Sequence, residues 1–311
     1  MPNLNEIQQQ ILREKAAAQD KVRQRFLKRL VSHTKRDTIL YATAFTSNKG
    51  AEVPPAALSV SAEDMQGFMA SLHRLKGKQL DLILHSPGGS MESADQIVQY
   101  LRSKYDHIRA IVPQNAMSAA TMIACACDEI VMGKHSAIGP IDPQVTFPTQ
   151  SGRFTAPAQS ILDEFEMAKR EIKADLSSAP LWATKIQAYP PGFLTLCATT
   201  LSLAESKVAE WLDKYMFAST EQRRGAEIAK WLANANEHKT HGRPIGARRA
   251  SNAGLKIFFL EDDQDLQERV LSVFHATMVT FQVTPCVKII ENHNGKGLYT
   301  RIELKAIPAS A

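Results

Sequence analysis

The stretch between residues 80 and 132 constrains the fold most, because short apolar runs alternate in it with helical patterns. Leu80–Leu84, Ile108–Val112 and Glu129–Met132 have the length and the apolar character of buried strands. Only a few residues separate each strand from the helical pattern beside it. Connections this short predict right-handed βαβ units and a largely parallel sheet. We therefore expect an α/β fold.

Two turns follow the carboxyl ends of the first two strands. The first is HSPGG, residues 85–89, and the second is NAMS, residues 115–118, which leads into the small-residue helix AATMIACACD. Ligand sites in parallel sheets lie just beyond the carboxyl ends of the strands. We therefore expect the two turns to contribute to one site.

Ser118 is the candidate nucleophile of this site. The first N–H groups of the following helix have no partners within it, so they point towards whatever binds beside the serine. Gly88 and Gly89 lack Cβ atoms, which lets their amides approach a ligand closely and complete an oxyanion hole. A tetrahedral intermediate would be stabilised there. The alternative interpretation is a serine that only caps the helix of an inactive scaffold.

A serine hydroxyl needs a base, and the chain offers several candidates. His85 and His135 lie within plausible reach, but neither has an obvious carboxylate to orient it. A lysine can serve when burial keeps its amine neutral. Lys169 is the expected base because it completes an apolar stripe of a predicted helix and should face inward, and Lys173 flanks the same face. The other members of the stripe are Ile161, Phe165, Ile172 and Leu176.

Asp142 lies between Pro140 and Pro143 in the segment SAIGPIDPQ. It could orient a base, but the two prolines fix the path of the chain and favour a rigid turn beside the site. Asp142 is therefore not included among the expected catalytic residues.

The segments LILHSPGGSMESADQIVQYL (82–101) and IVPQNAMSAATMIACACDEIVMGKHSAIGPIDPQ (111–144) closely resemble the serine dehydrogenase proteinase family. That family is a bacterial relative of signal peptide peptidase A within the Clp/crotonase-like fold. The resemblance covers residues 80–145 and extends more loosely to THGRPI and NAGL near residues 240–255. It implies a Clp/crotonase-like core of ββα units and a serine endopeptidase.

The resemblance also implies roles for individual residues. Ser118 takes the place of the nucleophile in the A-x-S-A/G pattern, and the oxyanion-hole amides correspond to Gly88, Gly89 and Ala119. Clp-type peptidases have a histidine near the position of IDPQ, and its absence here points to the signal peptide peptidase arrangement, in which a lysine of a downstream helix is the base. Lys169 follows the serine at a spacing similar to that family's lysine. Two alanines follow the serine where relatives commonly carry two glycines, and their methyl groups could narrow the site.

The expected organisation has three parts. Residues 1–35 form an N-terminal amphipathic helix, residues 36–180 form the hydrolase core, and residues 181–311 form a helical and mixed C-terminal extension. Within the core, residues 146–157 are interpreted as a polar loop and residues 158–177 as a helix. The N-terminal helix has a thin apolar stripe, which either a partner or the protein's own core covers. The stripe includes Leu4, Ile7, Ile11, Val22 and Phe26.

Composition excludes several classes of protein. The formal net charge of +5 is mild, so no nucleic-acid partner is expected, and a basic cluster within residues 21–29 is interpreted as solvated surface. The four cysteines lack the spacing of a zinc site and are interpreted as buried thiols. We find neither an apolar run long enough to span a membrane nor a signal peptide, which predicts a cytoplasmic protein.

The expected function is therefore cleavage of peptides or unfolded proteins by a Ser-Lys dyad, without a metal or a cofactor. The resemblance further implies a homo-oligomer. Two alternatives stay open, namely an inactive oligomeric scaffold and a crotonase-type acyl-CoA enzyme, which uses the same pair of oxyanion-hole amides. The acyl-CoA enzymes usually add a carboxylate acid or base and a place for the nucleotide, and the sequence has neither signature.

Overall fold

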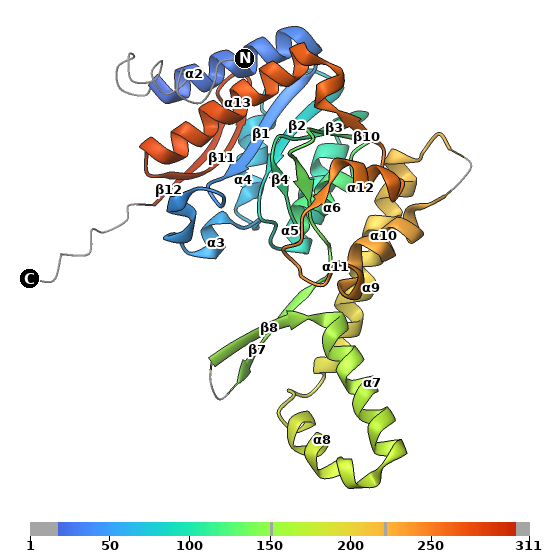
Figure 1. Cartoon of the computed structure of the whole chain (residues 1–311). Coiled ribbons are helices and arrows are strands. Elements are labelled where there is room, and N and C mark those ends of the chain that lie inside the picture. Colours follow the sequence, from blue (N-terminus) through green and yellow to red (C-terminus); the bar gives the residue numbers. More distant parts are fainter. Residues whose placement is uncertain (1–17, 150–151, 221–222, 303–311) are drawn as a thin grey trace, which may run out of the picture. The chain divides into compact units, whose positions relative to one another are not determined.

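The computed structural model describes residues 18–149, 152–220 and 223–302 (Figure 1). The chain divides into two compact units. The first unit contains the residues up to Ile138 and those from Ile245 onwards, and the second unit is Gly139–Pro244. The predicted boundary near residue 180 therefore falls inside the second unit, and the C-terminal part of the chain returns to the first.

The first unit is organised around a seven-stranded sheet with the strand order β10-β5-β3-β2-β1-β11-β12. The strands from β10 to β1 run parallel to one another, whereas β11 and β12 pair antiparallel. The predicted α/β fold with a largely parallel sheet is confirmed. The strands are β1 Asp37–Thr43, β2 Gln79–His85, β3 His107–Val112, β5 Glu129–Met132, β10 Ile257–Phe259, β11 Cys286–Asn292 and β12 Gly297–Arg301.

Two long helices cover one face of this sheet. They are α2 (Ala18–Thr34) and α13 (Gln264–Val283), which pack side by side (Figure 1). The buried residues of α2, such as Leu27, share one apolar cluster with α13 and with Leu40 and Ala42 of β1. The described part of the predicted N-terminal helix therefore packs on the protein's own core. The stripe residues Leu4, Ile7 and Ile11 lie outside the described residues.

Shorter helices complete the first unit. Tyr41 lies between Leu40 and Ala42 in β1. Its side chain points to the other face of the sheet, because successive side chains of a strand alternate between the two faces. Its ring packs edge-on against Phe68 of α4 (Asp64–Leu72), with the centroids 5.7 Å apart. The remaining helices are α3 Pro55–Leu58, α5 Met91–Arg102, α6 Ala119–Cys125 and α12 Ala247–Asn252, with 3-10 turns at Asn48–Ala51 and Leu260–Asp262.

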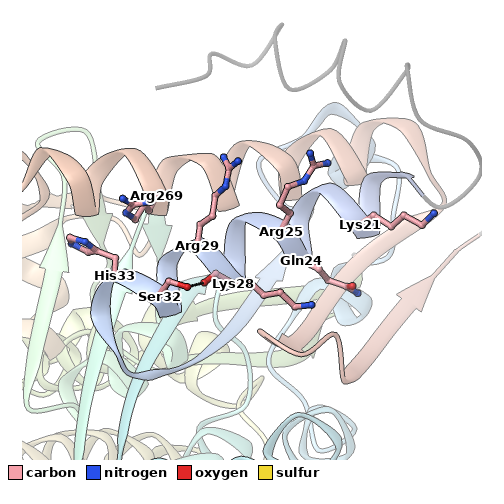
Figure 2. A pocket seen from close by; sticks show the side chains of 8 residues that line it. All are labelled: Lys21, Gln24, Arg25, Lys28, Arg29, Ser32, His33 and Arg269. Carbon is pink, nitrogen blue, oxygen red and sulfur yellow. Dashed lines mark hydrogen bonds between the residues drawn. The ribbon is translucent and has the colours of Figure 1, made fainter.

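The outer side of α2 is basic. A groove of about 680 Å³ is lined there by cations of α2 and by Arg269 of α13 (Figure 2). Arg23 belongs to the same basic run of sequence but is fully buried, where it is bonded to Glu291 and donates to the Thr280 hydroxyl over 2.8 Å. Within this basic segment, Arg23 therefore forms a buried ion pair, whereas the other cations of α2 line the groove. The α2 residues of the groove are Lys21, Gln24, Arg25, Lys28, Arg29, Ser32 and His33.

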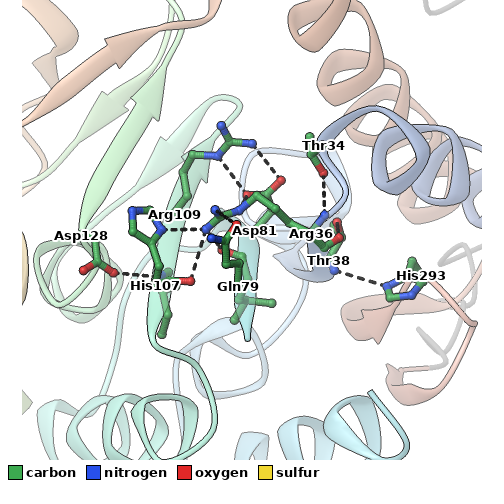
Figure 3. A network of polar contacts seen from close by, with 11 residues as sticks. Thr34, Arg36, Thr38, Gln79, Asp81, His107, Arg109, Asp128 and His293 are labelled. Atoms are coloured by element: carbon green, nitrogen blue, oxygen red, sulfur yellow. Dashed lines mark hydrogen bonds and ion pairs between the residues drawn. The ribbon is translucent and has the colours of Figure 1, made fainter. Parts of the chain in front are cut away.

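A polar network joins the amino ends of three neighbouring strands (Figure 3). Asp81 of β2 is completely buried, and its carboxylate accepts hydrogen bonds from Arg36, which precedes β1, and from Arg109 of β3. The Oδ1 distances are 2.7 Å and 2.9 Å, and Arg109 also reaches Oδ2 at 2.9 Å. Because each arginine belongs to a different chain segment, the carboxylate fixes the register of the parallel strands at this end.

A small three-stranded sheet joins the site region to the point where the chain leaves the first unit. Its strands are β4 Asn115–Ala116, β6 Ala137–Ile138 and β9 Ile245–Gly246, in the order β4-β6-β9. The pair β4 and β6 is parallel, and the pair β6 and β9 is antiparallel. The chain therefore leaves the first unit and returns to it on neighbouring strands.

The second unit is mainly helical. It begins with a hairpin of β7 (Gln144–Thr149) and β8 (Gly152–Pro157), so the polar loop predicted for residues 146–157 is wrong. Val145 and Phe147 alternate with polar residues and pack in an apolar cluster with Phe193, which explains the strand. The helices are α7 Ala158–Ala174, α8 Ala179–Ile186, α9 Phe193–Trp211, α10 Gly225–Ala233 and α11 Ala235–His238, with a short 3-10 helix at Leu176–Ser178 and a short π-helix at Leu212–Met216.

Candidate active site

Ser118 has a strained backbone at the start of α6. Its φ of 52° and ψ of −122° are rare for a residue with a side chain, and its hydroxyl makes no capping hydrogen bond with the helix. The interpretation as a simple helix cap is therefore not supported. Conformations of this kind cost about 1–3 kcal/mol and persist where the surroundings impose them, commonly at functional sites. A sharp strand-to-helix turn that presents a serine is also the geometry of a nucleophile elbow.

Hydrogen bonds on both sides hold this turn. The Met117 N–H donates to the Ser86 carbonyl over 2.9 Å, and the Ser86 N–H donates to Asn115 over 3.1 Å. The Thr121 hydroxyl donates to the Ala116 carbonyl over 2.7 Å. These contacts tie the end of β2 to β4 and to α6. The serine turn and the SPGG turn therefore form one rigid assembly.

Gly88 lies directly against the nucleophile turn. With a φ of 93°, a Cβ at this position would stand 2.5 Å from the Met117 carbonyl oxygen and 2.5 Å from the Cβ of Ser118. It would also stand 2.8 Å from the Ala119 nitrogen. Real Cβ atoms do not approach so closely, so only glycine fits. The two turns that the sequence places at strand ends thus meet as expected.

Two backbone N–H groups of this assembly are open to a ligand. The Gly88 N–H donates to the Ser86 hydroxyl over 3.2 Å, so it is already engaged. Neither the Gly89 N–H nor the Ala119 N–H has an acceptor among the described residues. Gly89, with a φ of 151°, also lies so close to Val60 that a Cβ would stand 2.4 Å from the Val60 carbonyl oxygen. Of the three expected oxyanion-hole amides, the two that can donate are those of Gly89 and Ala119.

The two candidate histidines are bonded elsewhere. His85 is fully buried, its Nδ1 accepts the Asn115 N–H, and its Nε2 lies 3.0 Å from the Thr46 hydroxyl. Burial lowers the pKa of His85 to about 3, which keeps the ring neutral. His135 places its Nε2 3.0 Å from the Pro113 carbonyl oxygen, to which that nitrogen donates. Both histidines therefore stabilise loops of the first unit.

Lys169 does not face inward in its own unit, so that prediction is wrong. Its side chain is 49% exposed, and its amine lies 2.8 Å from the Glu166 carboxylate. The buried residues of α7 are Ala158, Ile161 and Ala168, so Ala168 is buried and its neighbour Lys169 is not. One residue is about 100° of helix rotation, enough to move a side chain from the core to solvent. Lys173 and Leu176 are exposed as well.

The second unit contains a histidine and a carboxylate that the sequence did not pair. Nδ1 of His241 lies 2.8 Å from Oδ1 of Asp142, whose side chain is only 2% exposed. The other carboxylate oxygen accepts a hydrogen bond of 2.7 Å from the Gln144 amide. His241 itself is 28% exposed. The one signal for this pair in the sequence is that both residues lie in the segments that resemble the proteinase family, IDPQ and THGRPI.

Residues 59–179, which include Ser118 and its glycine turn, match the family described as ClpP-like SDH-type serine proteinase. The matched segment begins just after α3 and extends into the second unit.

Two curated relatives of this chain are uncharacterized proteins of Methanocaldococcus jannaschii. One is 30% identical over 208 residues, which is 65% of this chain and 62% of the relative. The other is 26% identical over 201 residues, which is 64% of this chain and 59% of the relative. The chain thus spans about three fifths of the length of these relatives.

Among solved structures, two variants of a membrane-bound stomatin-specific protease are similar to this chain. A serine-to-alanine variant has a TM-score of 0.40 and 15% identity, covering 68% of this chain and 79% of its own. A lysine-to-alanine variant in complex with a substrate peptide has a TM-score of 0.41 and 16% identity, covering 68% and 75%. In this chain, no helix within residues 18–149, 152–220 and 223–302 is long and apolar enough to cross a membrane.

Proposed function

We propose that this chain is a serine peptidase in which the Ser118 hydroxyl attacks the carbonyl carbon of a peptide bond. The observation that carries the proposal is the strained turn at Ser118, with its φ of 52° and its uncapped hydroxyl, packed against Gly88. Strain of this kind is retained where it positions a reacting group. The match of residues 59–179 to a serine proteinase family supports the same reaction.

Two backbone amides can stabilise the intermediate. As the bond between Oγ and the carbonyl carbon forms, negative charge develops on the carbonyl oxygen. The open N–H groups of Gly89 and Ala119 can both donate to that oxygen. Removing one donor of this type costs about 3 kcal/mol of transition-state stabilisation in serine hydrolases. Water then hydrolyses the acyl-enzyme that remains after the amine has left.

The alanines that replace the family's glycines are compatible with this reaction. Ala119 and Ala120 are 2% and 0% exposed, so their methyl groups fill the core beneath the turn. The N–H of Ala119 has no acceptor among the described residues and can still donate to a substrate. We therefore expect the Ser-Ala-Ala sequence to support catalysis.

The resemblance assigns proton transfer to Lys169 in a Ser-Lys dyad. An amine accepts a proton only when it is neutral, which burial favours and a neighbouring carboxylate opposes. Lys169 is half-exposed and paired with Glu166. A Ser-Lys dyad therefore requires that the Lys169 amine separates from the Glu166 carboxylate and becomes shielded from solvent when the substrate binds.

The family points to peptides as the substrate class, and we propose unfolded segments of proteins, cleaved by a homo-oligomer that limits access to the sites. The inactive scaffold and the crotonase-type acyl-CoA enzyme are the alternatives. A fluorophosphonate that labels serine hydrolases, together with a coenzyme A binding assay, separates the three. Labelling without coenzyme A binding supports the peptidase, the reverse result supports the acyl-CoA enzyme, and neither result supports the scaffold.

The decisive experiment is hydrolysis of unfolded casein and of a fluorogenic peptide library by the purified full chain. We expect Ser118→Ala to lower kcat by at least about 1,000-fold, because it removes the nucleophile and leaves only binding and the oxyanion hole. Ser103→Ala is the matched control, because Ser103 is exposed at the end of α5 and its hydroxyl donates to the nearby Tyr100 carbonyl. Equal activity of Ser118→Ala and wild type would refute the proposed function.

A further inference from the structure

Resting on the proposed peptidase function, we propose that a buried polar network next to the SPGG turn positions the backbone N–H that stabilises the oxyanion. At its centre is an ion pair in which the Lys288 amine lies 2.7 Å from the Asp64 carboxylate, with side chains only 5% and 1% exposed. A buried ion pair is weak evidence for stability, so what this pair holds in place is more informative than its energy. The network comprises Tyr41, Asp64, Ser86 and Lys288, all in the first unit.

The ion pair anchors the backbone on both sides of Val60. The Lys288 amine donates to the Ser59 carbonyl over 2.7 Å. The Ser61 N–H donates to Oδ2 of Asp64 over 3.0 Å. Val60 lies between these two anchored residues and is itself almost fully buried. Its backbone position is therefore set by the charged pair.

Val60 in turn fixes the direction of the Gly89 N–H. The Val60 N–H donates to the Gly88 carbonyl over 2.7 Å. That carbonyl and the Gly89 N–H belong to one peptide group, and they point in opposite directions because no described peptide bond is cis. The Gly89 N–H thus points away from Val60, and it has no acceptor among the described residues. Gly88 itself lies against the Ser118 turn.

A second path connects Asp64 to the same turn through Tyr41. The Tyr41 hydroxyl donates to Oδ2 of Asp64 over 2.7 Å. Burial and the Asp64 carboxylate raise the pKa of Tyr41 well above its usual value, so the phenol keeps its proton. Tyr41 lies opposite Leu84, and Ser86, two residues further on, shares its face of the sheet and hydrogen-bonds to the phenol. The Ser86 hydroxyl also accepts the Gly88 N–H over 3.2 Å.

Gly88 is therefore bonded at both its N–H and its carbonyl by chains of contacts that end at Asp64. Glycine has no side chain that could restrict its backbone, so the peptide group between Gly88 and Gly89 needs such external contacts to keep one orientation. An oxyanion-hole donor is effective when it is aimed at the developing charge before the reaction begins. The network supplies this rigidity without touching the substrate, so its members are positioning residues.

Tyr41→Phe in the full chain tests this role. It removes one hydroxyl from the network and keeps the ring that packs on Phe68. We expect kcat for peptide hydrolysis to fall about 10-fold and KM to stay within about twofold, because the Gly89 N–H acts mainly on the charge of the transition state. Tyr105→Phe is the matched control. Tyr105 is also buried, and its hydroxyl donates over 3.1 Å to the carboxylate of Asp37, at the start of β1, so its kcat should stay within about twofold of wild type.

Ser86→Ala tests the same path one step closer to the turn. It removes the acceptor of the Gly88 N–H, and we expect a similar loss of kcat at nearly unchanged KM. Because Tyr41 and Ser86 act through one chain of contacts, the double variant should be no more than about twofold slower than the slower single variant. Circular dichroism verifies folding, and Ser86→Ala replaces Tyr41→Phe if the latter does not fold.

Two results would overturn the positioning role while the peptidase stands, that is, with Ser118→Ala inactive. One is a wild-type kcat in Tyr41→Phe and Ser86→Ala, including a change confined to KM. The other is an equal loss of kcat in Tyr41→Phe and Tyr105→Phe, because that loss would follow from the removal of any buried hydroxyl. An active Ser118→Ala would instead refute the peptidase itself.

Discussion

The two ends of the parallel sheet are built in opposite ways. At the amino end, the buried Asp81 carboxylate is bonded to two arginines, so the charge there is fully paired (Figure 3). At the carboxyl end, Ser118 has a strained backbone, and the N–H groups of Gly89 and Ala119 have no acceptor within the described ranges. The amino end thus stabilises the strands. The carboxyl end keeps hydrogen-bonding capacity for a ligand.

The largest effect on stability should come from breaking the amino end. Asp81→Asn removes the charge that compensates two largely buried arginines, whose side chains are 10% and 17% exposed. We expect the free energy of unfolding to fall by about 3 kcal/mol, as for other buried ion pairs that lose one partner. Urea unfolding measures this change. Activity per folded molecule should stay unchanged, and a selective loss of kcat would contradict the division of roles between the two ends.

A smaller effect should appear in acid, through His85 at the carboxyl end of β2. Its pKa of about 3 in the folded state lies below the usual 6.5 of an unfolded chain. Between these values the unfolded chain binds one more proton, so stability falls as the pH falls, by about 1.4 kcal/mol per pH unit. Above pH 6.5 this contribution is constant.

His85→Gln isolates this contribution. The side chain of His85 is surrounded by the rings of Phe45 and Phe274 and by the Thr46 hydroxyl, none of which titrates in this range. Between pH 6.5 and 4.5, the free energy of unfolding should change less steeply with pH in His85→Gln than in the wild type. The difference between the two slopes should correspond to the uptake of about one proton on unfolding. Equal slopes would mean that His85 is protonated in the folded protein.

The smallest effect tests the strain at the nucleophile directly. At an ordinary helix start, replacing alanine by glycine lowers stability slightly, because glycine loses more backbone freedom. At Ser118 the order should be inverted, since only glycine adopts a φ of 52° without strain. We expect Ser118→Gly to be about 1 kcal/mol more stable than Ser118→Ala. A thermal unfolding comparison decides this, and the usual order would show that the turn is relaxed.

The sequence predicted the parts of the fold that local patterns encode. The apolar runs in β2, β3 and β5, and the two turns that meet at Ser118, follow from short-range periodicity and from glycine chemistry. The buried face of α7 contains Ala168 where Lys169 was expected, because that face packs against α9 and includes the alanines Ala158 and Ala168. Small residues of this kind give a weak hydropathy signal.

The pair of Asp142 and His241 could not be predicted locally, because the two residues are 99 positions apart in the sequence. Only the pairing of β6 with β9 makes them neighbours. The two prolines around Asp142 favour a turn, and a residue in a turn can still form an ion pair with a residue far away in the sequence. A search for opposite polar residues on either side of the inserted unit would have identified the pair.

The strand order has a consequence for biosynthesis. Strand β1 pairs with β2 on one side and with β11 on the other, yet β11 is formed by residues near the end of the described chain. Domains fold as units while the ribosome releases the chain from its N-terminus. The serine turn therefore leaves the ribosome long before the sheet beside it can close. We expect a nascent chain of this protein to be inert, with catalytic competence delayed until its last strands have been synthesised.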